Sequence, residues 1–162
     1  MDDAYKKINY ILVRLVNEIW ELEAKAIITD EFKDLTNNDM HVIEAIGLEG
    51  GRNMSTVAKK LDITVSSLTT AVNHLVKKQY VERSRSEEDR RVVFLSLTEK
   101  GTAAYKHHEE YHRQMTEAVL EKLDAEDMPV LLKVLDAVND FFRGYGKQMT
   151  EGKQNVGAAG EK

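Results

Sequence analysis

One short stretch of this chain has the residue types and spacing of a metal-dependent hydrolase. His108, Glu109 and His112 stand in the pattern HExxH, in which two histidines hold a zinc ion and the glutamate acts as a general base. Because the pattern fixes only three positions, it arises readily in a helix that is rich in histidine and glutamate. No further catalytic architecture is evident around it, so we expect that the protein is not an enzyme.

The same two histidines could bind a metal without catalysis. His108 and His112 lie one turn apart on the apolar stripe of a helix predicted over residues 98–123, so both should point inward. An unsatisfied imidazole is costly there. His41 and Glu23, on two other predicted helices, could complete a set of three nitrogens and one carboxylate, which suits tetrahedral zinc. Alternatively, no cofactor is required, and these are buried, hydrogen-bonded histidines that hold helices together.

A second group of polar residues lies on a helix predicted over residues 64–78. Short hydroxyl and amide side chains and one lysine form its outward face: Ser66, Ser67, Thr69, Thr70, Asn73 and Lys77. Such side chains can approach base edges and phosphates closely, and Asn suits adenine. Capping of the helix would explain Thr64 and Ser67. It would not explain polar residues as far as Asn73, where helix propensity favours Ala, Glu or Lys.

The opposite side of this helix is predicted to face the core, with an apolar stripe of Val65, Leu68, Val72, Leu75 and Val76. A charged hairpin then follows. Strands predicted over residues 80–85 and 92–97 flank an acidic and basic turn, and the cationic side chains of the hairpin are Arg83, Arg85, Arg90 and Arg91. A narrow minor groove attracts an inserted arginine through its negative potential. Asp89 could aim such an arginine by a bidentate ion pair. The alternative is an ordinary surface turn whose ion pair contributes little.

The order of the elements favours DNA contact over an ordinary turn. Helices over residues 53–61 and 64–78 are joined by the short turn Asp62-Ile63, and the second helix of such a pair lies in the major groove. The hairpin comes directly after it, as in a winged helix-turn-helix. We include Ser55, near the start of the first helix, among the expected contacts to double-stranded DNA. The whole chain is predicted to be mainly α, with six helices and this small β-wing.

Charge is divided unevenly along the chain. The net charge is −5 at pH 7, yet residues 52–101 hold 10 Lys and Arg against 6 acids, which leaves −9 for the remainder. A basic module on an acidic scaffold is expected where one face meets phosphate. On charge alone, chance fluctuation in a charged surface is an equal alternative.

Two long amphipathic helices, at opposite ends of the chain, exceed the needs of this module and require a partner for their apolar stripes. We expect an N-terminal dimerisation arm at 1–34, a DNA-binding lobe at 35–100, C-terminal dimerisation helices at 101–149 and a flexible tail at 150–162. No apolar run could cross a membrane, no signal peptide is present, and there is no cysteine. These features predict a cytoplasmic protein without thiol chemistry or a membrane partner.

Two motifs resemble the MarR family of bacterial transcription regulators. The run Asp89-Arg90-Arg91 through Leu97-Thr98-Glu99-Lys100-Gly101 is similar to the family signature "DxR…LT…G", and the pattern from Val57 to Thr69 also matches. The resemblance covers about residues 5–145. It implies a homodimeric regulator that acts as a repressor, in which Arg91 enters the minor groove and Asp89 orients it. Two-fold symmetry then predicts a pseudo-palindromic operator with half-sites about one helical turn apart.

A finer resemblance concerns what the protein senses. The segments over residues 39–47 and 83–93 look like the branch that represses fatty-acid synthesis genes in Gram-positive bacteria. Members of that branch respond to acyl chains on acyl carrier protein, which would be a second partner. Glu23, His41, His108 and His112 match by position the zinc site of the family's zinc-uptake regulators. The sequence leaves an acyl ligand and zinc open as alternatives.

Overall fold

The computed structural model describes residues 2–27 and 29–157. It is mainly helical with a small antiparallel sheet, which confirms the predicted fold class. Two compact units are present, one ending at Gln114 and the other beginning at Met115. The helices are α1 (Asp2–Ile27), α2 (Asn37–Ile46), α3 (Met54–Lys60), α4 (Val65–Lys77), α5 (Glu99–Leu120) and α6 (Met128–Gly157), and the strands are β1 (Arg52–Asn53), β2 (Val81–Arg85) and β3 (Val93–Leu97).

Side-chain caps fix where three of the helices begin. Thr36 and Asp39 form a reciprocal capping box at α2, with the Thr36 hydroxyl accepting from the Asp39 amide and the Asp39 carboxylate accepting from the Thr36 amide. Asn53 caps α3 and Thr64 caps α4, each accepting from a backbone amide three residues on. The Thr64 cap was predicted from the sequence. Asp62 turns the chain between α3 and α4 with a positive φ of 54°.

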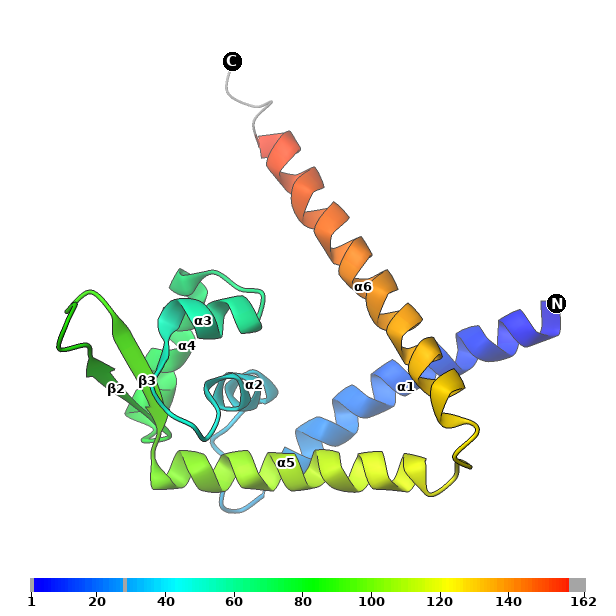
Figure 1. Cartoon of the computed structure of the whole chain (residues 1–162), viewed down its shortest axis with the longest axis horizontal. Helices are drawn as coiled ribbons and strands as arrows, with labels where there is room; N and C mark the ends of the chain where they lie inside the picture. The colour runs from blue at the N-terminus through cyan, green and yellow to red at the C-terminus, as the bar shows by residue number, and fades with distance from the viewer. Residues whose placement is uncertain (1, 28, 158–162) are drawn as a thin grey trace. The chain divides into compact units, whose positions relative to one another are not determined.

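The sheet has three strands in the order β1-β3-β2, all antiparallel. The predicted hairpin is confirmed, with Val81 opposite Leu97 and Arg85 opposite Val93. The short strand β1 was not predicted, because two residues carry no alternating pattern. It pairs Arg52 with Leu95 and so joins the start of α3 to the base of the hairpin. Figure 1 shows the hairpin beside α3 and α4.

The core of the first unit lies among α2, α3, α4, the sheet and the start of α5. Its fully buried side chains include Ile43, Ile46, Val57, Leu68, Val72, Leu75, Tyr80 and Leu95. Of the predicted α4 stripe, Leu68, Val72 and Leu75 are buried, whereas Val65 and Val76 are 45% and 36% exposed. These two residues lie at the edges of the stripe, where the helical period turns them away from the core.

The long helices α1 and α6 carry exposed apolar side chains in the single chain. On α1, Ile8, Leu15 and Leu22 are each about half exposed, and on α6 the same holds for Leu135 and Phe142. Helix α6 continues to Gly157, so residues 150–157 of the expected tail are helical, and residues 158–162 lie outside the described residues. Within the described chain, no helix has both the length and the apolarity to cross a membrane. The expected boundaries between arms and lobe stay a prediction.

Candidate nucleic-acid interface and metal centre

The outward face of α4 is exposed along its whole length. Its six predicted contact residues are all exposed: Ser66, Ser67, Thr69, Thr70, Asn73 and Lys77. Some of their hydroxyls are already used by the helix. Thr69 donates to the Val65 carbonyl at 2.7 Å, and Ser67 shares a 2.9 Å bond with the Thr64 cap. In the described part of the chain, the side chains of Asn73 and Lys77 have no hydrogen-bond partner and are free to contact a ligand.

The hairpin presents its arginines in the same open way. Arg83, Arg85, Arg90 and Arg91 are exposed, and none of their guanidinium groups forms an ion pair or hydrogen bond among the residues that the structure describes. A cationic fork that is free and exposed favours phosphate or a groove of DNA as its partner.

The tip of the hairpin is built by side-chain-to-backbone hydrogen bonds. Asp89 accepts from the Arg91 amide at 2.9 Å, and the Ser86 hydroxyl accepts from the amides of Glu88 and Asp89. These contacts form an Asx-type turn. The expected bidentate pair between Asp89 and an arginine guanidinium is not found within the described chain. Asp89 therefore positions Arg91 through the backbone of the turn. The hydrogen bond from the Arg91 amide to the Asp89 carboxylate fixes the backbone conformation, and with it the direction of the chain after the turn.

One hollow joins the two elements. It has a volume of about 720 Å³ and lies between the N-terminal ends of α3 and α4 and the hairpin. Five predicted contact residues line it: Ser55, Thr69, Arg83, Arg85 and Arg91. The structure thus gathers on one concave surface residues that are up to 36 positions apart (from Ser55 to Arg91). The sequence analysis did not anticipate Asn53, Met54 and Ser84, which also line the hollow.

Three of the four predicted metal ligands meet between α1 and α5. Glu23 and His108 are buried, and His112 is half-buried. The Glu23 Oε1 atom lies 3.1 Å from His108 Nε2 and 3.6 Å from His112 Nε2, and the two Nε2 atoms are 3.2 Å apart. His41 lies beside this group, with its ring centroid 6.1 Å from that of His108. Its Nδ1 atom lies 3.9 Å from a carboxylate oxygen of Glu44.

The three donor atoms have the separations expected around a metal. With bonds of about 2.0–2.1 Å, two ligand atoms of a tetrahedral zinc ion lie roughly 3.3 Å apart. Hydrogen bonds among the three side chains explain these separations less well than a metal ion does. The Nε2 atom of a neutral His108 bears either a proton or a lone pair, so it cannot donate to Glu23 and accept from His112 at once. The residues therefore fit a metal ion that would accept all three lone pairs.

Burial favours the neutral form of His108. Desolvation lowers the pKa of His108 below its ordinary value, while the hydrogen bond with Glu23 works in the opposite direction. The neutral form is the one that binds a metal. Glu109, the base that the HExxH pattern would require, is exposed on α5 and is not part of the cluster. The third group at the two histidines is instead Glu23 from α1.

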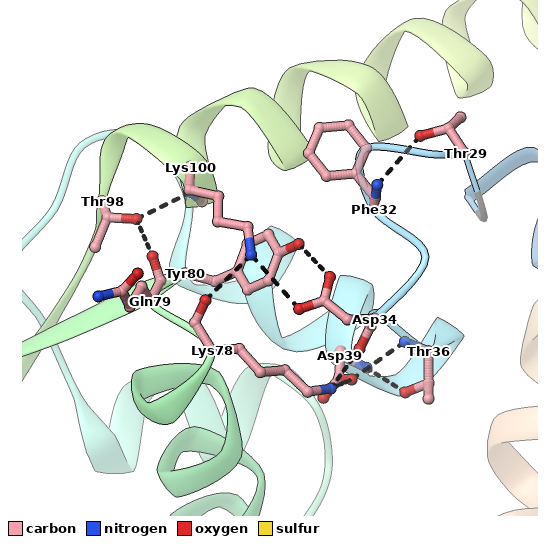
Figure 2. Close-up of polar contacts among 11 residues, drawn as sticks. Thr29, Phe32, Asp34, Thr36, Asp39, Lys78, Gln79, Tyr80, Thr98 and Lys100 are labelled. Atoms are coloured by element: carbon pink, nitrogen blue, oxygen red, sulfur yellow. Dashed lines mark hydrogen bonds and ion pairs between the residues drawn. The ribbon is translucent and has the colours of Figure 1, made fainter.

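A further polar cluster was not predicted from the sequence. Tyr80 donates to Asp34 at 2.7 Å, and Lys100 pairs with the same carboxylate at 3.5 Å (Figure 2). These three residues come from the connector after α1, the link after α4 and the start of α5, and the pair Asp34–Tyr80 spans 46 positions. No local sequence pattern predicts such a contact, because each of the three residues is of a type that is common at protein surfaces or in cores.

Comparison with known proteins identifies relatives of this chain. Residues 35–93 match the sequence model of the MarR family. The HTH-type transcriptional regulator YwhA of Bacillus subtilis is 30% identical over 64% of this chain and 74% of its own length. The transcriptional regulator ZitR of Lactococcus lactis is 29% identical over 67% of this chain and 77% of its own length.

A solved structure resembles this chain over nearly its whole length. FabT of Streptococcus pneumoniae, in a crystal structure with DNA, is 35% identical to it with a TM-score of 0.79. That similarity covers 87% of this chain and 99% of FabT. The residues that match the family model, 35–93, include α4, β2 and the turn that follows β2.

Proposed function

We propose that this chain, which belongs to the MarR family of winged helix-turn-helix transcription regulators, is a homodimeric repressor of fatty-acid synthesis genes that responds to an acyl ligand. Membership of this family makes the chain a DNA-binding regulator and not an enzyme. The repressor role, the pathway and the ligand are our proposal. The observation that carries the DNA contact is the exposure of the polar outward face of α4 beside the unpaired arginines of the hairpin, with Thr69, Arg83 and Arg91 lining one hollow between the two elements.

In this proposal α4 lies in the major groove. Asn73 is exposed and unpaired among the described residues, and an amide of this kind can bond the N6 and N7 atoms of adenine. The Thr69 hydroxyl donates its hydrogen to the Val65 carbonyl. Its methyl group and an oxygen lone pair remain available for contacts in the groove. Lys77, at the last turn of α4, is suited to a phosphate contact that positions the helix without reading sequence.

The hairpin supplies the second contact. Arg91 lies beside the exposed tip, where its guanidinium can enter a narrow minor groove. Arg83 and Arg85, on β2, line the hollow between the hairpin and α4 and are placed to meet the backbone that separates the two grooves. Asp89 bears on this contact indirectly, through the amide of Arg91.

Dimer formation is supported by the apolar faces of α1 and α6. Trp20 and Phe141 are 60% and 62% exposed in the single chain, and such residues on long amphipathic helices are normally covered by a partner. A two-fold axis would present two copies of α4 to DNA. The operator is then a pseudo-palindrome with half-sites about 34–36 Å apart, which is one turn of DNA.

The acyl ligand is supported by similarity alone. FabT is similar over nearly the whole chain, and the segments over 39–47 and 83–93 resemble the branch that represses fatty-acid synthesis genes. In our proposal the acyl chain is presented by acyl carrier protein and occupies an apolar site near the dimer helices. Binding there would change DNA affinity by favouring one spacing of the two recognition helices.

Genome-wide recovery of DNA fragments bound to the protein tests the proposal. We expect an operon for fatty-acid synthesis among the recovered fragments. Purified full-length protein is then titrated onto that fragment by fluorescence anisotropy, with acylated carrier protein and with unacylated carrier protein as its control. The pathway proposal fails if no such operon is recovered, or if the two carrier proteins have the same effect on DNA affinity.

A second candidate is a zinc-responsive regulator of metal uptake, and the convergence of Glu23, His108 and His112 favours it. These residues would hold the ion, with His41 as the nearest further imidazole. A bound ion would neutralise the carboxylate and fix α1 against α5. We expect Glu23→Gln and His108→Asn to lose zinc in a competition titration with a chromogenic chelator. His107→Asn is the control, because His107 Nε2 contacts the Ala26 carbonyl and lies outside the cluster.

The zinc titration also decides between the two candidates. If the unmodified protein fails to compete with the chelator, the metal candidate is excluded and the histidines are structural. If zinc binds and the recovered DNA carries a metal-transporter operon, the acyl proposal is replaced by the metal one.

A further inference from the structure

The connector between α1 and α2 is fastened to the DNA-facing elements by a small group of polar residues, which we call the connector junction: Asp34, Asp39, Lys78, Tyr80 and Lys100 (Figure 2). The Tyr80 hydroxyl donates to Asp34 Oδ1 at 2.7 Å, and Lys100 Nζ lies 3.5 Å from Asp34 Oδ2. The same ammonium group lies 4.0 Å from the centroid of the Tyr80 ring. Each of the three side chains therefore contacts the other two.

A second set of contacts ties α4 to the start of α2. Lys78, the C-cap of α4, donates from Nζ to Asp39 Oδ2 at 3.0 Å and also to the Asp34 carbonyl. Asp39 is at the same time the capping-box partner of Thr36. Lys100 donates to the Lys78 carbonyl at 3.3 Å. The end of α4 is thus joined to the connector and α2 through the Lys78 side chain, and to α5 through the Lys78 carbonyl.

The junction also sets the angle between α4 and the hairpin. Lys78, Gln79 and Tyr80 form the link from α4 to β2, and Gln79 has a positive φ of 65°. Thr98, next to α5, donates its hydroxyl to the Gln79 carbonyl at 2.6 Å and its amide to the Tyr80 carbonyl at 3.1 Å. The two elements that we propose to face DNA, α4 and the hairpin, are therefore joined by a link whose backbone is held by hydrogen bonds.

The buried position of Tyr80 separates this group from ordinary surface ion pairs. The residue is fully buried, and a buried hydroxyl requires an acceptor. Burial, followed by the hydrogen bond to Asp34, raises the pKa of Tyr80 well above its ordinary value, so the hydroxyl stays a donor at neutral pH. A surface pair could exchange this partner for water, whereas Tyr80 cannot.

We infer that Tyr80 and Asp34 are positioning residues that fix the DNA-reading lobe relative to the arm formed by α1, and so set the spacing of the two recognition helices in the dimer. The inference rests on the proposed function, because spacing matters only if the dimer binds two half-sites. Asp34 acts through Tyr80 and touches no DNA. The specificity that it controls is the distance between half-sites and not the base sequence of either one.

The test compares operators of different spacing. The binding constants of the full-length dimer are measured by fluorescence anisotropy for an operator with its natural spacing and for versions with one base pair added or removed. We expect Tyr80→Phe and Asp34→Ala to weaken binding to the natural operator by about fivefold to tenfold, because each removes the hydrogen bond between the two side chains and so lets the lobe depart from the natural spacing. Binding to the altered operators should weaken less, so the preference for natural spacing falls.

The matched control is Tyr105→Phe. Tyr105 packs against the same core, but its hydroxyl is not part of the connector junction. We expect this variant to keep the spacing preference of the unmodified protein. If Tyr80→Phe also keeps it, the inference is wrong. It is equally wrong if Tyr80→Phe weakens binding to all three operators by the same factor together with a lower melting temperature, since that is the result of general destabilisation.

A second measurement does not depend on DNA. The chain contains no cysteine, so Glu87→Cys at the exposed hairpin tip provides one spin-label site in each protomer. Double electron–electron resonance then reports the distance between the two tips. We expect Tyr80→Phe, and not Tyr105→Phe, to broaden or shift that distance. An unchanged distance overturns the inference, even if the unmodified protein binds its operator. A changed distance in a protein that binds no specific DNA supports the positioning role while the proposed function fails.

Discussion

The outward face of α4 and the connector junction carry similar polar residues, yet they use them in opposite ways. On α4 and the hairpin, Asn73, Lys77 and Arg91 are exposed and have no partner for their side chains in the described part of the chain. In the connector junction, Tyr80 and Asp34 are bonded to each other and to Lys100. The first surface keeps its hydrogen-bonding capacity for another molecule, while the second uses it to hold three segments together.

This difference identifies function better than residue type does. A polar side chain that is already satisfied gains little from a ligand, because it must break one bond to form another. An exposed cation without a partner gains a charge-assisted bond when phosphate arrives. The metal cluster lies between these extremes. Glu23, His108 and His112 contact one another, and each has a lone pair that a metal ion would accept.

The largest effect is expected where the junction is packed most tightly. A Cβ atom added at Gly101 would overlap the carbonyl oxygen of Tyr80. We expect Gly101→Ala to lower the free energy of unfolding by more than about 3 kcal/mol, since backbone must move to make room. Urea unfolding followed by circular dichroism measures this. The control is Gly144→Ala in α6, where the new atom meets nothing within 4 Å.

The control should keep the stability of the unmodified protein or gain about 0.5–1 kcal/mol, because alanine favours a helix over glycine. Equal stability of the two variants would mean that the link after α4 is not fixed against α5. The connector junction would then be held no more rigidly than the exposed face of α4.

The exposed surface is tested by removing one cation at the tip of the hairpin. We expect Arg91→Ala to weaken operator binding by about 1–3 kcal/mol, or roughly 5- to 150-fold. The melting temperature and the dimer should not change, because the Arg91 guanidinium forms no hydrogen bond or ion pair with the residues that the structure describes. Fluorescence anisotropy at several salt concentrations measures the loss. Glu87→Gln at the same tip is the control and should bind DNA at least as well as the unmodified protein. Unchanged affinity in Arg91→Ala would reject the minor-groove contact.

A smaller and more selective loss is expected on α4. Asn73→Ala should weaken binding to the natural operator by about tenfold through a single base contact. Binding to unrelated DNA should stay the same, because the amide contributes no charge to phosphate neutralisation. Competition between operator and random duplex separates the two affinities. If both fall together, Asn73 supports the helix and does not distinguish bases.

The smallest effect concerns acid stability. Burial alone would raise the pKa of Asp34, but the hydrogen bond from Tyr80 and the charge of Lys100 outweigh it, so this pKa lies below its ordinary value. The stabilisation is therefore full above the unfolded pKa of about 3.9 and is lost as pH falls through the folded pKa. We expect Asp34→Asn to lose less stability than the unmodified protein on acidification below about pH 4. The difference should stay under about 1 kcal/mol, because the carboxylate is partly exposed.

Thermal unfolding measured from pH 6 to pH 3 follows this difference. A parallel decrease in both proteins would show that Asp34 gains nothing from Tyr80 and Lys100 when it is charged. The connector junction would then be held by packing rather than by its hydrogen bonds.

Features encoded within a few neighbouring residues were predictable. The Thr64 cap was predictable because its side-chain oxygen and the Ser67 amide from which it accepts a hydrogen bond lie within one turn of helix. The outward face of α4 was found because the helical period separates exposed from buried positions. The short strand β1 was missed, since its pairing with β3 depends on residues more than 40 positions away.

The amino-acid sequence by itself determined the order of the helices, the basic hairpin and the family signature, all of which depend on local spacing and residue type. Tertiary structure decided the rest. It placed Ser55 and Arg91 around one hollow, brought Glu23 rather than Glu109 to the two histidines, and joined Asp34 to Tyr80. The physical reason is that these contacts depend on how helices pack, which is fixed by the shape of the whole core and leaves no periodic trace in the chain.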